Sequence, residues 1–235
     1  HIDYSNDGIF MIDNDGIGIP IVIHDTETKK QGHIVYNPEV AVSVPFAGTN
    51  IEKSRESTKG GTNGLGAKII NFNSKWFMIN IGDSKNKKTY LQRFDDHGRI
   101  IGEPKIGDYK DKKGRVILTF LPDYVKFDYG MASSEYNTIN SYLKFRCYQA
   151  AAYVNKYNVE IKFNDEVCHV GNAGGLLRVI SNLDDPYVMD IIGKSTDERY
   201  KKHPWDISIW ISAEREKFSH KSIINGVITD TGVHI

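Results

Sequence analysis

Residues 60–68 read Gly60-Gly61-Thr62-Asn63-Gly64-Leu65-Gly66-Ala67-Lys68, and this stretch decides the fold. The apolar residues that follow it, Ile69, Ile70 and Phe72, predict a short helix. Glycines let successive backbone N–H groups face one ligand, and such a run just before a helix binds anions. Lys68 in the first helical turn adds a full positive charge. The stretch therefore predicts a seat for a triphosphate.

A second glycine loop lies upstream, where residues 13–20 read Asp13-Asn14-Asp15-Gly16-Ile17-Gly18-Ile19-Pro20. It follows the apolar run 9–13, which predicts a buried strand. The Asp15 carboxylate can accept a hydrogen bond from an amino group such as N6 of adenine, and glycines let a flat ring approach the backbone. The glycine spacing alone favours two tight turns with a local cap at Asp15, so that alternative stays open.

Familiar nucleotide motifs do not fit these loops. The P-loop requires glycine, four residues, glycine, lysine and then serine or threonine. Gly61 and Gly66 have the right separation, but Ala67 precedes Lys68 and Ile69 follows it. Neither loop continues into the dinucleotide fingerprint Gly-x-Gly-x-x-Gly. Both of these common nucleotide folds are therefore excluded.

The segments around the loops predict an α/β (α+β) two-layer sandwich with a mixed sheet. Strands are expected at residues 76–81, 89–94, 116–121, 159–163, 205–211 and 222–228. Helices are expected at residues 38–46, 134–155 and 175–183. The polar stretch 49–59 is expected to be a loop, and residues 184–204 a connection between domains.

Composition limits the class of protein. The 235 residues carry 30 Lys and Arg against 30 Asp and Glu, which argues against a DNA-wrapping surface. With 40% hydrophobic residues a sizeable core is expected. The sequence contains no apolar run of about 18 residues, so it predicts no membrane-spanning helix. Cys147 and Cys168 lack metal-site spacing and fit a reducing compartment. The chain starts at His1 and ends in what looks like an unfinished element, so we expect a fragment.

The residues of both loops closely resemble ATP motifs of the type IIA DNA topoisomerases, a family within the superfamily of gyrase, Hsp90, histidine kinases and MutL. The resemblance is most specific at residues 63–68, Asn-Gly-Leu-Gly-Ala-Lys. It extends to residues 47–50, 119–123 and 223–226, and so covers nearly the whole chain. It implies a Bergerat-type ATP-binding fold, with an N-terminally truncated ATP-binding domain at 1–196 and the beginning of a transducer domain at 197–235.

Carried onto this sequence, the resemblance implies an ATP site built from three segments. Asn14 and Asp15 would contact the nucleotide from its adenine side, next to Gly18. Near the sugar and phosphates would lie Gly48, Thr49 and Asn50. The triphosphate would be wrapped by Gly61, Thr62, Asn63, Gly64, Leu65, Gly66, Ala67 and Lys68, with Lys68 on the phosphates.

The family's activity is implied in the same way. ATP and Mg²⁺ would be cofactors, and ATP binding and hydrolysis would close a homodimeric gate and pass one DNA duplex through another, which relaxes or decatenates DNA during replication. Double-stranded DNA would be bound by domains outside this chain, with no membrane partner. The expected location is intracellular: the nucleus for a cellular protein, or the host-cell cytoplasm, viral factory or virion for a viral one.

Some positions depart from the family pattern. Cellular eukaryotic enzymes usually have Arg at Thr62, Tyr at Leu65 and Ser-Ser-Asn at 48–50, so the sequence looks more like enzymes of large DNA viruses. The catalytic Glu and the magnesium-binding Asn are expected upstream of His1, and the transducer Lys beyond Ile235, so no catalytic or metal residue is assigned. Two alternatives are another ATPase of the superfamily, such as a MutL-like one, and a non-catalytic ATP-binding dimerisation module.

Overall fold

The computed structural model describes residues 1–47, 64–129, 133–154, 158–181, 189–194, 204–209, 222–224 and 227–229. The chain divides into two compact units, His1–Asn140 and Ser141–Ile235. None of the described helices is long and apolar enough to cross a membrane.

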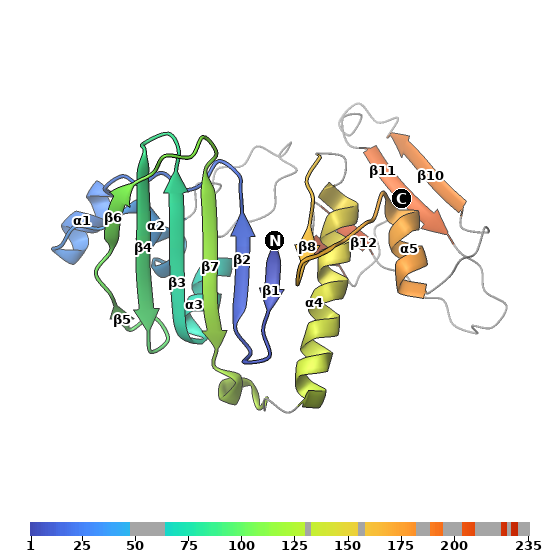
Figure 1. The fold of residues 1–235 in the computed structure, drawn as a ribbon, viewed down its shortest axis with the longest axis horizontal. Coiled ribbons are helices and arrows are strands. Elements are labelled where there is room, and N and C mark those ends of the chain that lie inside the picture. The colour runs from blue at the N-terminus through green and yellow to red at the C-terminus, as the bar shows by residue number, and fades with distance from the viewer. Residues whose placement is uncertain are drawn as a thin grey trace. The chain divides into compact units, whose positions relative to one another are not determined.

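The first unit is a sheet with helices on one face (Figure 1). Its strands follow the order β5-β4-β3-β7-β2-β1, with β6 paired to β4, and neighbouring strands run antiparallel. The strands are β1 (Ile2–Tyr4), β2 (Phe10–Asn14), β3 (Ser74–Asp83), β4 (Lys88–Asp95), β5 (Ile100–Ile101), β6 (Lys105–Asp108) and β7 (Arg115–Pro122). The helices are α1 (Asp25–Gln31), α2 (Asn37–Ser43), α3 (Gly66–Phe72) and the 3₁₀ helix η1 (Tyr124–Phe127).

The core of this unit lies between the sheet and helices α2 and α3. Alternate residues of β3 and β4 point to the helices, as strand geometry requires. Aromatic rings connect the strands: Phe77 lies 6.2 Å from Phe94 and 5.9 Å from Phe120 between ring centroids. The fully buried members of the cluster include Phe77, Ile79, Ile81, Tyr90, Phe94 and Val42. The predicted two-layer packing of sheet and helices is confirmed.

A hydrogen-bonded polar group lies inside this core. Gln92 Nε2 donates to Glu39 Oε2 at 2.8 Å and to the Gly102 carbonyl at 3.0 Å. The hydroxyl of Tyr90 donates to Gln92 Oε1, and burial raises the pKa of Tyr90 well above its usual range. Because Glu39 is in α2 and Gln92 in β4, the group ties one layer to the other.

The second unit contains most of α4 (Ser133–Val154), which begins in the first unit, and the hairpin of β8 (Lys162–Phe163) and β9 (Glu166–Val167). After α5 (Ala173–Ser181), β10 (Met189–Lys194) pairs antiparallel with β11 (Pro204–Ile209). A second hairpin joins β12 (Ser222–Ile224) to β13 (Val227–Thr229).

Most predicted elements are confirmed, among them the strands β2, β3, β4, β7 and β11 and the helices α2, α3, α4 and α5. Two predictions are wrong. The one strand expected at 222–228 is two paired strands, β12 and β13, and the strand expected at 159–163 is only Lys162–Phe163. The segment 184–204 contains β10, and its role as a connection between domains stays a prediction. The loop predicted at 49–59 lies outside the described residues, and the boundary at 196/197 stays a prediction.

Candidate nucleotide-binding site

The first glycine loop, residues 15–20, starts where β2 ends. Asn14 pairs with Val116, and Gly82 pairs with Arg115, so β2, β3 and β7 share this end of the sheet. Asn14 Oδ1 accepts a hydrogen bond from Gly16 N at 2.7 Å, which closes a tight turn. Gly18 has a φ of +82°, a left-handed conformation that favours glycine. Asn14, Gly16 and Gly18 therefore form the tight turn that their sequence predicts.

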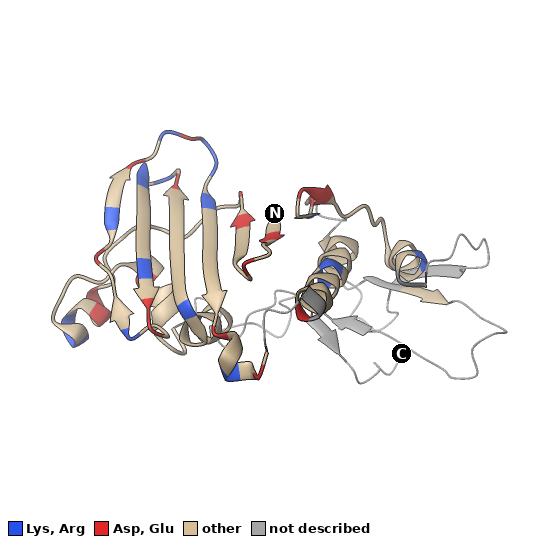
Figure 2. Cartoon of the chain, turned by 60° about the horizontal axis from the view of Figure 1, so that its bottom comes forward, with Lys and Arg blue, Asp and Glu red and all other residues tan. Residues whose placement is uncertain are grey.

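Two carboxylates at this turn face basic residues of the β6–β7 region. Asp13 Oδ1 accepts from Arg115 Nε at 2.9 Å. Asp15 Oδ2 lies 3.2 Å from Lys113 Nζ, and both side chains are nearly four-fifths exposed, at 79% and 78%. Figure 2 shows the acidic tip of β2 beside the basic start of β7. An ion pair between such exposed side chains is weak, so the Asp15 carboxylate stays accessible to a ligand.

Replacing Asp13 with asparagine is expected to reduce acid sensitivity. The hydrogen bond from Arg115 is the main cause that holds the pKa of Asp13 below its usual value, against a smaller opposing effect of burial. A depressed folded-state pKa stabilises the fold above the unfolded pKa of about 3.9, and this contribution is lost as the pH falls through the folded pKa. In urea unfolding, Asp13→Asn should lose about 1 kcal/mol at pH 7 and less at pH 2. The exposed Asp7→Asn is the control, and parallel pH curves for wild type and Asp13→Asn would contradict the expectation.

The second glycine loop is described from Gly64 onward. Gly64 has a φ of +57°, and α3 starts two residues later at Gly66. Lys68 lies in the first turn of α3, but its side chain is only 3% exposed and Nζ donates to the Ala47 carbonyl at 3.0 Å. Burial lowers the pKa of Lys68. Its contact with a phosphate stays a prediction.

The remaining predicted site residues, Gly48, Thr49, Asn50, Gly61, Thr62 and Asn63, lie outside the described residues. The described parts of both loops are anchored in one hydrophobic cluster. Ile19 lies in the first loop and Ile21 follows it, Ala67 lies in the second loop and Ile70 follows it in α3, and all four pack in the same core. The segments next to both loops are therefore packed in one hydrophobic core.

Sequence reasoning missed a buried acid that supports the first loop. Asp83, at the end of β3, accepts a hydrogen bond from Ile21 N at 2.8 Å and is almost completely buried. Burial opposes its ionisation, but hydrogen bonds from Asn86, Ile21 and Lys85 outweigh it and keep the pKa of Asp83 low. The only signal in the sequence is an aspartate ending a strand, which is too common to single out.

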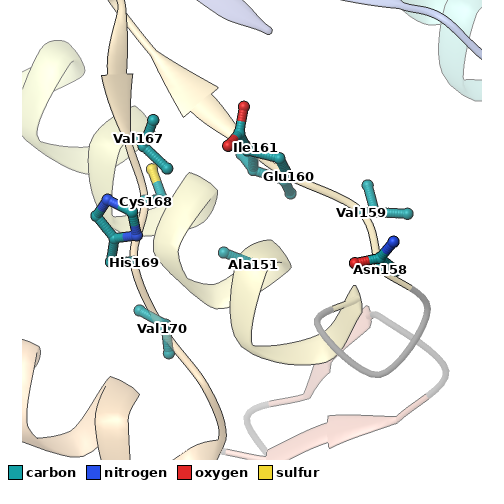
Figure 3. A pocket seen from close by; sticks show the side chains of 9 residues that line it. All are labelled: Ala151, Asn158, Val159, Glu160, Ile161, Val167, Cys168, His169 and Val170. Carbon is teal, nitrogen blue, oxygen red and sulfur yellow. The ribbon is translucent and has the colours of Figure 1, made fainter.

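A separate hollow of about 230 Å³ lies in the second unit, between Ala151 of α4 and residues 158–161 and 167–170 (Figure 3). Ligand pockets usually measure about 300–1,000 Å³, and none of the predicted site residues lines this one. Within the described ranges, no three His, Cys, Asp or Glu side chains gather as a metal site would require.

Comparisons with known proteins agree on one family, although no protein-family model matches the chain. DNA topoisomerase 2 of African swine fever virus (strain Badajoz 1971 Vero-adapted) is 33% identical over 232 residues, which cover 97% of this chain and 19% of that protein. A probable DNA topoisomerase 2 of Dictyostelium discoideum is 27% identical over 225 residues, 96% of this chain and 14% of that one. The chain thus spans about a fifth or less of these relatives.

Solved structures agree on the fold. The ATPase region of Saccharomyces cerevisiae topoisomerase II superposes with a TM-score of 0.79 at 23% identity, over 97% of this chain and 56% of that one. The ATPase and transducer domains of Balamuthia mandrillaris topoisomerase II give 0.72 at 20% identity, over 97% and 53%. The chain is thus similar to type II DNA topoisomerases over 97% of its length, and its fold is that of the ATPase regions of these enzymes.

Proposed function

We propose that this chain is the ATP-binding region of a type II DNA topoisomerase, in which ATP binding and hydrolysis close a dimeric gate and drive passage of one DNA duplex through another. The observation that carries the proposal is the pair of glycine loops anchored in one core, with Asp15 open to a ligand on the first and Lys68 on the second. Similarity to topoisomerases over 97% of the chain supports it.

The proposed roles follow the chemistry of each segment. Asn14, Asp15 and Gly18 face the adenine, since a carboxylate and an amide side chain can exchange hydrogen bonds with its amino group and ring nitrogen. Residues 48–50 and 61–68 surround the sugar and phosphates. The ammonium of Lys68 has three protons, so it can keep its contact with Ala47 and still donate to a phosphate oxygen. ATP, once bound, supplies the phosphoryl chemistry that resets the gate.

The partners and location belong to the same proposal. Mg²⁺ accompanies ATP, but we assign it no ligand because the described residues offer no cluster of metal-binding side chains. Two copies of the protein form the gate, and duplex DNA is handled by domains outside residues 1–235. The similarity to viral enzymes supports a viral protein located in the host-cell cytoplasm, the viral factory or the virion; a cellular one would work in the nucleus.

Calorimetry with a non-hydrolysable ATP analogue tests the proposal on the 235-residue chain. We expect saturable binding of one nucleotide per chain, which a GTP analogue does not match in affinity. The same titration with a pyrimidine triphosphate analogue separates recognition of the base from simple attraction of a polyanion. Absence of binding at about 1 mM, the concentration where −4 kcal/mol of binding free energy is detectable, would refute the proposal.

A further inference from the structure

The connection between β6 and β7, residues 109–114, lies directly against the first glycine loop. Gly114 is buried, and a side-chain carbon placed there would overlap the Ile17 carbonyl oxygen and lie 2.8 Å from that of Gly16. The two backbones therefore touch without any side chain between them. Both segments cross the same end of the sheet, at the top in Figure 1.

Tyr109 fixes the other end of this connection. Its ring occupies the space that a side chain on Gly82 would need, so it packs against the end of β3. Its hydroxyl donates to the Lys113 carbonyl at 2.9 Å, and its backbone N–H donates to the Lys87 carbonyl at 3.0 Å. Tyr109 thus fixes the backbone position of Lys113 and of the adjacent Gly114 relative to the end of β3.

The first glycine loop also contacts the ends of β3 and β7. A side-chain carbon on Gly18 would lie 3.4 Å from the Gly82 carbonyl oxygen and 3.8 Å from Arg115 N. The backbone of residues 16–18 therefore contacts both the strand ends and Gly114 of the connection, so any group added at Gly114 must displace it. The ion pair of Lys113 with Asp15 adds little to this, because both side chains are largely exposed.

We propose that Tyr109 and Gly114 are positioning residues of the nucleotide site, which fix the backbone of residues 15–18 and thereby set the site's preference for adenine. The inference rests on the proposed function. A site that reads a base by hydrogen bonds must hold its donors and acceptors to within about 0.5 Å. Here backbone packing supplies that accuracy, although neither residue touches the nucleotide.

The variant Gly114→Ala inserts one methyl group between the two backbones. Gly114 does not adopt a positive φ, so alanine is compatible with its own conformation and acts only through this contact. We expect the affinity for the ATP analogue to fall about tenfold or more, as for loss of one or two ligand hydrogen bonds. Because the base contacts fail while phosphate contacts persist, the ratio of ATP to GTP affinity should fall toward one.

Gly102→Ala is the matched control. A side-chain carbon there would lie 2.9 Å from the Arg93 carbonyl oxygen, so it strains the β4–β5 region without touching the glycine loop. It should lower the unfolding midpoint and leave the affinity ratio unchanged. Tyr109→Phe keeps the ring and removes only the hydrogen bond to Lys113. It should lower the ratio by about threefold, which tests the idea even where Gly114→Ala fails to fold.

The outcomes separate the inference from the proposed function. Wild-type chain that binds neither analogue would refute the function, and the inference with it. Wild-type binding with an ATP to GTP ratio near one would overturn the inference alone. The inference would also be overturned if the ratio of ATP to GTP affinity stayed at the wild-type value in Gly114→Ala and Tyr109→Phe. It would be overturned as well if Gly102→Ala lowered this ratio as much as Gly114→Ala does.

Discussion

Replacing Phe77 with alanine is expected to lower the free energy of unfolding by about 3–5 kcal/mol. The side chain is completely buried, and its ring packs between Phe94 of β4 and Phe120 of β7. These neighbours belong to strands hydrogen-bonded to β3, so the backbone can relax only partly into the cavity. Urea unfolding at pH 7 followed by circular dichroism measures the change.

Val125→Ala is a suitable control for this substitution, because Val125 lies exposed in η1. It should change the stability by less than about 0.5 kcal/mol. A loss below about 1 kcal/mol for Phe77→Ala would mean that the layer between sheet and helices is not the main source of stability. The midpoint should shift without a change in the urea dependence, since both states keep their compactness.

Replacing Lys68 with methionine is expected to weaken binding of the ATP analogue by about 10- to 150-fold. This range corresponds to the 1.5–3 kcal/mol of a charge-assisted hydrogen bond. Methionine keeps most of the side-chain volume at this buried position, so the loss reports on the ammonium rather than on a cavity. Calorimetry gives the affinity, and thermal unfolding without nucleotide checks that the variant is folded.

Lys75→Met, at an exposed position of β3 shortly after α3, is the control for loss of charge in general. It should leave the affinity within about twofold of wild type. If Lys68→Met binds the analogue as well as the wild type does, the lysine serves only the Ala47 carbonyl, and its phosphate role is refuted.

Elements with a regular apolar pattern could be predicted from the sequence, whereas elements stabilised by polar contacts could not. β3 and β4 alternate buried and exposed residues, which is the pattern that packing against a helical layer requires. α1 has no such pattern: it is held by Glu27 N donating to His24 Nδ1, by the Lys30–Glu27 ion pair and by Gly32 in a left-handed conformation. The hairpin of β12 and β13 was missed although Asn-Gly, the strongest short hairpin signal, stands between its strands in the sequence.

The same division holds for the site. The glycines of both loops could be predicted because Gly18 and Gly64 need a positive φ that glycine adopts freely. The residues that hold the first loop in place could not, because Asp83, Tyr109 and Gly114 are distant from it in sequence and contact the backbone of the loop or of its neighbours. A steric fit between two backbones leaves no local pattern.

The buried Gln92 has a consequence for how the sheet assembles. Tyr90, Gln92 and Phe94 face the helices, while Arg93 lies on the opposite face, with its guanidinium 4.9 Å from the centre of the Trp76 ring. A one-residue shift in the register of β4 would bury Arg93 and would leave the Glu39 carboxylate without the hydrogen bond from the Gln92 amide. The bond between Gln92 and Glu39 therefore adds an energetic cost to this shifted pairing, beyond the cost that apolar contacts alone would impose.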